Sequence, residues 1–165
     1  MKIHRNFIDK EYLKKLQELL YGKNTPFPWY YLDYLVSNPK DSISNFYHLL
    51  YQFYKPTSDY FNLFETLINK INPTALIRIR LNLYPKTGKS FETVFHTDVD
   101  DIKNYRTAIF YLNTNNGYTV FENKKIKSEE NTLVDFDGST LHKAVSSTDD
   151  KKDFNIALNQ GIQKT

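Results

Sequence analysis

The chain of 165 residues contains no cysteine. A disulfide framework, a catalytic thiolate and a zinc site with cysteine ligands are therefore excluded, and any metal site must use nitrogen and oxygen ligands. Glycine and proline number only 5 and 6, too few for a low-complexity, disordered chain. No window approaches the roughly 20 apolar residues of a membrane span, and the first residues lack the apolar core of a signal peptide. We expect a soluble, intracellular protein of the cytoplasm.

Charge of one sign is also scarce, because 22 basic residues are nearly balanced by 19 acidic ones. No dense basic block stands out, so nucleic-acid binding is not indicated. Aromatic residues, in contrast, are abundant, with 13 tyrosines and 12 phenylalanines. This aromatic content favours a sheet-rich fold. A chain of this length is expected to form a single domain, residues 1–165.

The N-terminal part of the chain, residues 1–72, is predicted to be mainly helical. Asp9 is a suitable N-cap, and leucines follow it at the spacing of one helix face. Two further helices are predicted at Asn45–Tyr54 and Ser58–Ile71, and Asn72-Pro73 closes this region.

The apolar period changes to two after Leu76, where aliphatic residues alternate with arginine, asparagine and tyrosine up to Pro85. Further strands are predicted at residues 93–96, 105–112, 118–122, 131–136, 142–146 and 154–160. Helices first and strands after imply an α+β fold. We expect a jelly roll in residues 73–165, with the N-terminal helices backing one of its sheets.

His96-Thr97-Asp98 contains two metal-ligand residues at positions i and i+2, which leave the same face of an extended chain. His142, at the start of a predicted strand, is the candidate third ligand. Two histidines and one carboxylate form the facial triad of non-haem Fe(II) oxygenases, which leaves coordination positions open. The alternative is structural: His96 and Asp98 would then be turn residues, and His142 a hydrogen-bonded core histidine.

Around these residues, the stretch from Asn82 to Gly161 resembles the prolyl-hydroxylase-like Fe(II)/2-oxoglutarate-dependent dioxygenases. Asn82–Pro85 before His96-Thr97-Asp98 is similar to the family's strand that ends in Tyr-Pro, and residues 105–113 are similar to its next core strand. Residues 116–121 resemble its Gly-Gly-x-Thr-x-Phe turn, although one glycine is an asparagine here, and residues 136–145 resemble the segment that supplies the distal histidine. Residues 27–31 resemble small phage-encoded members.

The resemblance implies a double-stranded β-helix, which is the cupin-like form of the jelly roll. It implies iron held by His96, Asp98 and His142, with 2-oxoglutarate and O₂ as cosubstrates. The implied reaction hydroxylates a substrate and releases succinate and CO₂. Peptidyl or prolyl side chains, free amino acids and nucleobases are all candidate substrates. A virus-encoded enzyme of this kind would act in the cytoplasm of its host.

The resemblance also suggests residues for the cosubstrate pocket. It makes Tyr111 a hydroxyl donor to the far carboxylate of 2-oxoglutarate, and Asn82 and Tyr84 neighbours of the end that chelates iron. Alternation supports this, because Asn82 and Tyr84 share a strand face with Arg78 and Arg80. The alternative for these residues is a solvated strand face.

One position departs from the family, which carries a basic residue, commonly arginine, at the head of its last core strand. Asp153 stands there in this chain, preceded by Lys151 and Lys152. A lysine offers a point charge in place of arginine's two-pronged contact. We predict Lys152 as the anchor of the far carboxylate in preference to Arg80, unless the lysines belong to a solvated turn.

Two other classes of function remain open from the sequence. A cupin-like barrel could bind another metal or ligand without oxygenase activity. A nucleic-acid-binding protein without chemistry would need a clustered basic surface and a steep salt dependence of binding.

Overall fold

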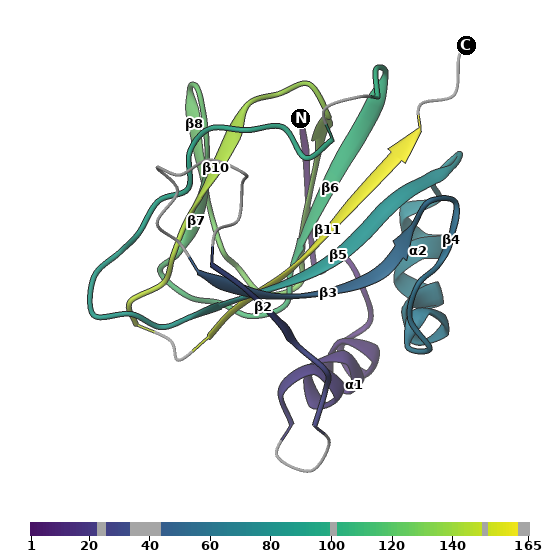
Figure 1. Ribbon diagram of the computed structural model, residues 1–165, viewed down its shortest axis with the longest axis horizontal. Helices are drawn as coiled ribbons and strands as arrows, with labels where there is room; N and C mark the ends of the chain where they lie inside the picture. The colour runs from purple at the N-terminus through teal and green to yellow at the C-terminus, as the bar shows by residue number, and fades with distance from the viewer. Residues whose placement is uncertain (23–25, 34–43, 100–101, 150–151, 162–165) are drawn as a thin grey trace.

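The computed structural model describes residues 1–22, 26–33, 44–99, 102–149 and 152–161. Its strands form two antiparallel sheets that stand opposite each other (Figure 1), and the α+β jelly roll predicted from the sequence is confirmed. The large sheet has the order β1-β9-β6-β11-β5-β3-β2, with β4 paired to β3, and the small sheet has the order β10-β7-β8.

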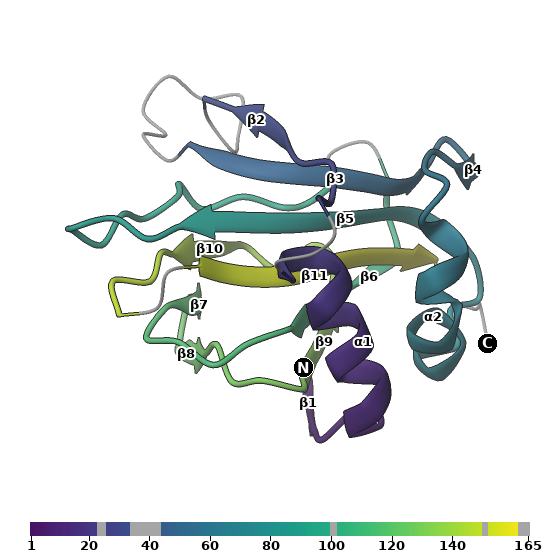
Figure 2. The same cartoon turned by 90° about the horizontal axis from the view of Figure 1, so that it is seen from below.

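The strands of the large sheet are β1 (Lys2–Arg5), β2 (Tyr30–Leu32), β3 (Asn45–Gln52), β4 (Lys55–Pro56), β5 (Leu76–Pro85), β6 (Tyr105–Tyr111), β9 (Thr132–Asp137) and β11 (Lys152–Gly161). Those of the small sheet are β7 (Tyr118–Phe121), β8 (Lys124–Lys127) and β10 (His142–Val145). The helices α1 (Lys10–Tyr21) and α2 (Glu65–Ile71) lie outside the large sheet, on the side away from the small sheet (Figures 1 and 2). Within the described residues, neither helix is long and apolar enough to span a membrane.

Helix α1 begins where the sequence predicts. The Asp9 side chain accepts hydrogen bonds from the backbone N–H groups of Glu11 and Tyr12, at 2.8 and 3.2 Å, and so caps the helix. Leu13, Leu16 and Leu20 form its buried face against the large sheet. Helix α2 is shorter than predicted, because a 3₁₀ turn at Phe61–Phe64 precedes it.

The predicted helix at Asn45–Tyr54 is wrong, because residues 45–52 form strand β3 between β2 and β5. Residues 1–72 are therefore not mainly helical. The segment reads NFYHLLYQFY, a short run with apolar residues at nearly every position, and in such a run the apolar period cannot separate helix from strand. Its aromatic content favours the strand, where rings pack on a half-buried surface.

Residues 93–96 are predicted as a strand, but of these only His96 forms an isolated bridge, with His142, and a second bridge pairs the preceding Glu92 with Val145. The other strands predicted after residue 76 are present with shifted ends. Strands β1, β2, β4 and β8 were not predicted. All four are short, two to four residues, and lie at or near sheet edges, where a strand lacks a clear apolar period.

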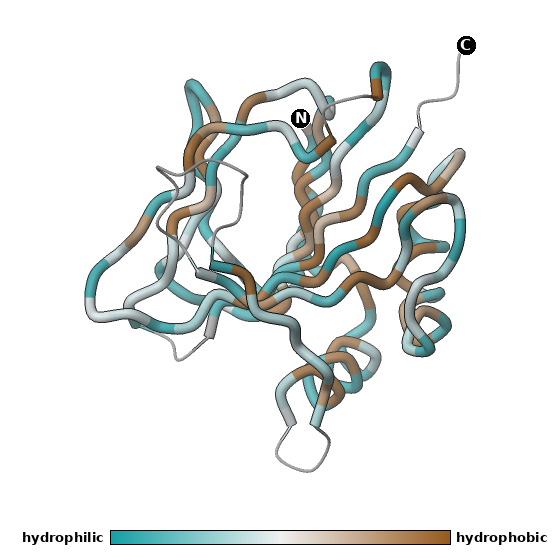
Figure 3. Tube along the Cα trace, in the orientation of Figure 1, coloured by the Kyte–Doolittle hydropathy of each residue, from teal (hydrophilic) through white to brown (hydrophobic). Residues whose placement is uncertain are grey.

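The large sheet separates two groups of buried side chains. Toward the helices lie residues such as Ala108, Phe110, Phe154 and Ile156, in the main core. Toward the small sheet lie Ile109, Tyr111, Phe121, Ile126, Val134 and Phe136. Apolar residues follow the strands and gather where the helices meet the sheet (Figure 3). Alternation along each strand therefore decides which side chains enter the space between the sheets.

The hairpin between β3 and β4 has an unusual turn. Gln52 pairs with Lys55, so Phe53 and Tyr54 form a two-residue loop, and their φ angles are 55° and 61°. Such turns favour Asn-Gly, because residues with bulky side chains are disfavoured at positive φ. Both rings are largely exposed, at 75% and 81%. This chain therefore keeps two strained aromatic residues at the tip of an exposed hairpin.

Replacing Phe53 by Asn together with Tyr54 by Gly should stabilise the protein by about 1 kcal/mol, because it relieves the left-handed strain. The free energy of unfolding in urea measures this gain. Replacing both residues by Ala is the control, since it removes the rings but leaves β-carbons at positive φ, and it should give no gain. A less stable Asn-Gly variant would show that the rings contribute more than the strain costs.

Candidate metal centre and adjoining pocket

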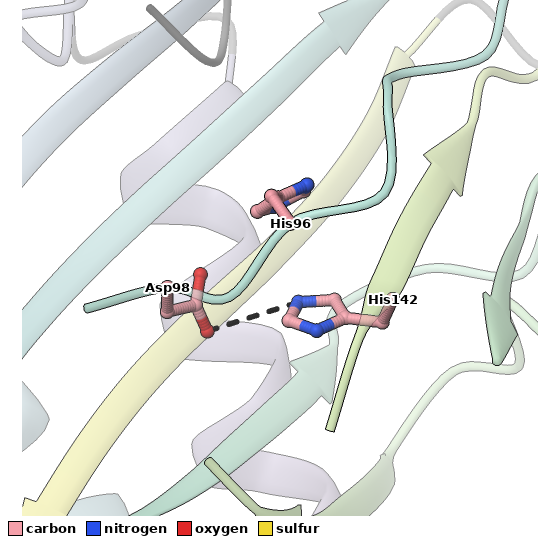
Figure 4. A group of neighbouring side chains, drawn as sticks. All are labelled: His96, Asp98 and His142. Atoms are coloured by element: carbon pink, nitrogen blue, oxygen red, sulfur yellow. Dashed lines mark ion pairs between the residues drawn. The ribbon is translucent and has the colours of Figure 1, made fainter. Parts of the chain in front are cut away.

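His96, Asp98 and His142 meet in the space between the two sheets. Their metal-ligand atoms all lie within 4.8 Å of one another, and His142 Nε2 is 3.9 Å from an Asp98 carboxylate oxygen (Figure 4). His142 begins β10 of the small sheet, and His96 and Asp98 lie in the segment between β5 and β6. Two reciprocal backbone hydrogen bonds of 3.0 Å join residues 96 and 142. The structure therefore brings together the three residues that the sequence predicts as metal ligands.

Both imidazole rings are oriented by backbone carbonyls. His96 Nδ1 lies 3.0 Å from the Val94 oxygen, and His142 Nδ1 lies 3.1 Å from the Thr140 oxygen. A carbonyl only accepts, so each Nδ1 carries a proton, and Nε2 is the ring nitrogen that remains for a metal. Burial lowers the pKa of His142, although Asp98 opposes that shift. The neutral form of His142, which is the form that binds metals, is therefore favoured.

The Asp98 carboxylate is held by residues of the large sheet that the sequence analysis did not identify. Arg78 Nη2 lies 3.3 Å from one oxygen, and Asn159 Nδ2 donates to the other at 3.1 Å. Asn159 is itself fixed by Arg78 Nε, at 3.1 Å, and by Thr107 at 3.0 Å. The alternation of β5 places Arg78 on the same face as Arg80, so the sequence could have indicated that Arg78 points to the same side. Its partner Asn159 on β11 could not be found in this way, because that contact depends on the register in which the two strands pair.

The charge of Asp98 follows from these neighbours. Burial by itself would raise the pKa of the carboxyl, but His142, Arg78 and His96 hold it below its ordinary value. Asp98 is therefore a carboxylate at neutral pH. Two imidazoles and one oriented carboxylate form the donor set of a facial triad.

A pocket of about 230 Å³ adjoins the three ligands. Strand β5 contributes four alternate residues to its wall, and the pocket is lined by Arg78, Arg80, Asn82, Tyr84, His96, Thr97, Asp98, Ile109, Thr119, His142, Ala144, Asn155 and Ala157. The alternation expected for β5 is therefore correct, and the strand face that carries Asn82 and Tyr84 is not solvated. Asn82 also donates a 3.0 Å hydrogen bond to Asn155, a residue that the sequence analysis missed.

Tyr111 is buried behind the pocket wall. Its hydroxyl is 2.7 Å from the Thr119 hydroxyl, and Thr119 lines the pocket. Burial raises the pKa of Tyr111, so the phenol stays protonated and can act as a hydrogen-bond donor.

The predicted basic anchors differ in position. Arg80 lines the pocket, and its guanidinium lies 4.8 Å from the Tyr47 ring centre. Lys151 and the side chain of Lys152 lie outside the described residues, and the backbone of Lys152 pairs with Pro85. Asp153 follows, buried and paired in register with Tyr84.

Sequence comparisons found no matching family model and no matching curated protein. Solved structures are similar to the chain across nearly its whole length. A prolyl hydroxylase from Trichoplax adhaerens, in complex with a hypoxia inducible factor peptide, gives a TM-score of 0.59 at 15% identity, over 97% of this chain and 82% of that one. A prolyl-4-hydroxylase from Pseudomonas putida gives 0.56 at 14%, over 98% and 92%.

An oxidoreductase of the 2-oxoglutarate–Fe(II) oxygenase family from Burkholderia pseudomallei gives a TM-score of 0.63 at 9% identity, over 94% of this chain and 82% of that one. The chain has the 2-oxoglutarate oxygenase fold. The double-stranded β-helix expected from the sequence is thereby confirmed. In this chain the oxygenase fold brings its His-x-Asp segment and its distal histidine to one point between the sheets.

Proposed function

We propose that the protein is an Fe(II)- and 2-oxoglutarate-dependent oxygenase, which hydroxylates a substrate and releases succinate and CO₂. The observation that carries this proposal is the triad of His96, Asp98 and His142, with ligand atoms within 4.8 Å of one another beside a polar pocket. The oxygenase fold of the chain supports it.

The three residues fit a ferrous ion. Nitrogen and oxygen donors of this kind suit iron, and a triad leaves coordination positions for a cosubstrate and O₂. When bound, iron would supply the activation of O₂ that side chains cannot provide. The protein's own contribution is orientation: Arg78 and Asn159 hold the carboxylate, and two carbonyls hold the imidazoles.

The pocket residues would receive the 2-oxoglutarate. Asn82 and Tyr84 line the same pocket as the triad and are proposed to contact the cosubstrate there. Tyr111 is proposed to act toward the far carboxylate through the Thr119 hydroxyl, since Thr119 stands between Tyr111 and the pocket. Arg80 and Lys152 are the proposed cations for that carboxylate.

A peptidyl substrate is the best supported of the candidate classes, ahead of a free amino acid or a nucleobase. Two of the similar structures described above are prolyl hydroxylases, one of them bound to a peptide. A second hollow next to Arg78 and Asp98, lined by Phe53, Tyr54 and Ile77, would present apolar surface to such a substrate. The cytoplasmic location and virus-encoded origin stay predictions.

A cupin-like barrel that binds a metal without 2-oxoglutarate is the second candidate. Asp153 favours it, because this buried acidic residue stands where the family carries a basic one.

Anaerobic titration with 2-oxoglutarate separates the two functions. Protein loaded with Fe(II) should develop the weak visible charge-transfer band of a chelated 2-oxo acid, and His96→Ala protein should not. In air, the wild-type protein should convert 2-oxoglutarate to succinate in the presence of Fe(II). Bound iron with neither band nor succinate would reject the oxygenase in favour of the cupin-like barrel.

A further inference from the structure

We propose that Arg80, in the middle of β5, is the cation that binds the far carboxylate of the cosubstrate, in place of a basic residue at the head of β11. This inference rests on the proposed oxygenase function, and it changes the preference for Lys152 drawn from the sequence. It assigns the anchor to a different strand of the same sheet.

Arg80 has room to act inside the pocket. Its register partner on β11 is Ala157, and Ala157 in turn pairs with Ile109 of β6. All three line the pocket that contains the triad. The small side chain of Ala157 leaves the arginine next to open space.

The guanidinium of Arg80 lacks partners that a buried charge needs. Its Nε and Nη2 atoms are buried and have no hydrogen-bond partner among the described residues. Arg78 and Arg106, in contrast, are each paired with an aspartate. An unpaired buried charge is unfavourable, and an anionic ligand with two oxygens matches the two-pronged donor geometry of arginine. A carboxylate in the pocket would supply the missing partners.

The orientation of the Arg80 side chain suits the far end of a ligand. Its guanidinium lies over the ring of Tyr47, and Tyr47 pairs with Asn82, four residues along β5 from Arg78. Four residues of strand correspond to about 13 Å. Arg78 already forms an ion pair with Asp98, the proposed metal ligand. Arg80 is directed away from that carboxylate, toward Asn82, and is therefore the arginine that remains for a ligand.

Strand β11 offers no cation to this pocket among its described side chains. Asn155 and Ala157 line the wall, and Asn159 binds Asp98. Asp153 lies on the same face of β11 as the pocket residues Asn155 and Ala157, but an aspartate would repel a carboxylate.

Arg80→Met should raise the thermal midpoint of the ligand-free protein, because it removes a charge whose buried Nε and Nη2 have no hydrogen-bond partner in the described part of the chain. The matched control is Arg106→Met. Arg106 lies on β6 of the same sheet and makes contacts of 2.8 and 2.7 Å with Asp135. That variant should lower the midpoint, because it leaves the aspartate without its partner. A lower midpoint in Arg80→Met would contradict the unpaired state of Arg80.

The anchor itself is tested with two ligands and Mn(II)-loaded protein, by calorimetric titration. One ligand is 2-oxoglutarate, and the other is 2-oxopentanoate, which has a methyl group in place of the far carboxylate. Wild-type and Arg106→Met proteins should prefer 2-oxoglutarate by about 100-fold, the range of a charge-assisted contact. Arg80→Met should bind the two ligands about equally, with Mn(II) affinity unchanged. Arg80→Lys should keep about a tenfold preference.

Each of the other possible results rejects one specific part of the proposal. Failure of the wild-type protein to bind either 2-oxo acid rejects the oxygenase function itself. A preference retained in both Arg80 variants but lost in Lys152→Ala leaves the oxygenase in place and assigns the anchor to β11. Equal binding of both ligands by the wild-type protein shows that no anchor exists. If Arg80→Met fails to fold, an undiminished preference in Arg80→Lys overturns the inference.

Discussion

His142→Ala protein is expected to lose metal binding and all metal-dependent turnover while it remains folded. The imidazole is one of three donors that the described residues bring to the centre, and even residues that merely orient a ligand change metal affinity by about 10- to 100-fold. We therefore expect Mn(II) affinity to fall at least 100-fold. The fold should persist, because the bonds that join residues 142 and 96 are made by the backbone. Calorimetric titration and circular dichroism measure the two quantities.

His4→Ala is the control for this experiment. His4 is an exposed histidine on β1 and contacts Phe7, outside the metal centre. Its replacement should leave Mn(II) affinity unchanged. Full metal affinity in His142→Ala would reject the triad, and the equivalent changes at His96 and Asp98 should each give the same loss.

Phe154→Ala is expected to destabilise the protein by about 3–5 kcal/mol, the range found for deleting a buried aromatic side chain. Phe154 is 1% exposed and lies on the helix side of β11. Its ring stacks on Tyr21 of α1, with centroids 4.5 Å apart, and lies 5.7 Å from Trp29. The substitution would therefore leave a cavity where α1 meets the sheet. Equilibrium unfolding in urea measures the loss.

Phe53→Ala provides the comparison, because the Phe53 ring is 75% exposed. An exposed substitution of this kind should change stability by no more than about 0.5 kcal/mol. Similar effects at positions 53 and 154 would contradict the position of Phe154 in the core.

The elements that the sequence predicted well have local signals. Asp9 caps the helix that begins next to it, so its neighbours in sequence are also its partners. Strand β5 has one polar and one apolar face, which gives a clear period of two. The triad was predictable because His96 and Asp98 are two residues apart and because residues 136–145 resemble a known segment.

The missed features depend on contacts between distant segments. Strand β3 is covered by side chains on both faces, so it lacks the alternation that identified β5. The bonds from Arg78 and Asn159 to Asp98 require β11 and β5 to pair in one register, with Asn159 opposite Arg78. The same register puts Arg80 beside Ala157. The alternation of polar and apolar residues within one segment does not show in which register that segment pairs with another strand.

The three ligands all lie outside the large sheet, although the large sheet builds most of the pocket wall. His142 belongs to the small sheet, and His96 and Asp98 to the segment that follows β5. Substitutions in β5 and β11 that leave Arg78 and Asn159 in place can thus change what binds beside a metal ion without removing any of its proposed donors. Under selection, a positive charge could move from β11 to the neighbouring β5 in steps that each preserve a working metal centre. Proteins descended from one ancestor could then bind the same metal ion but differ in the 2-oxo acid that they use as cosubstrate.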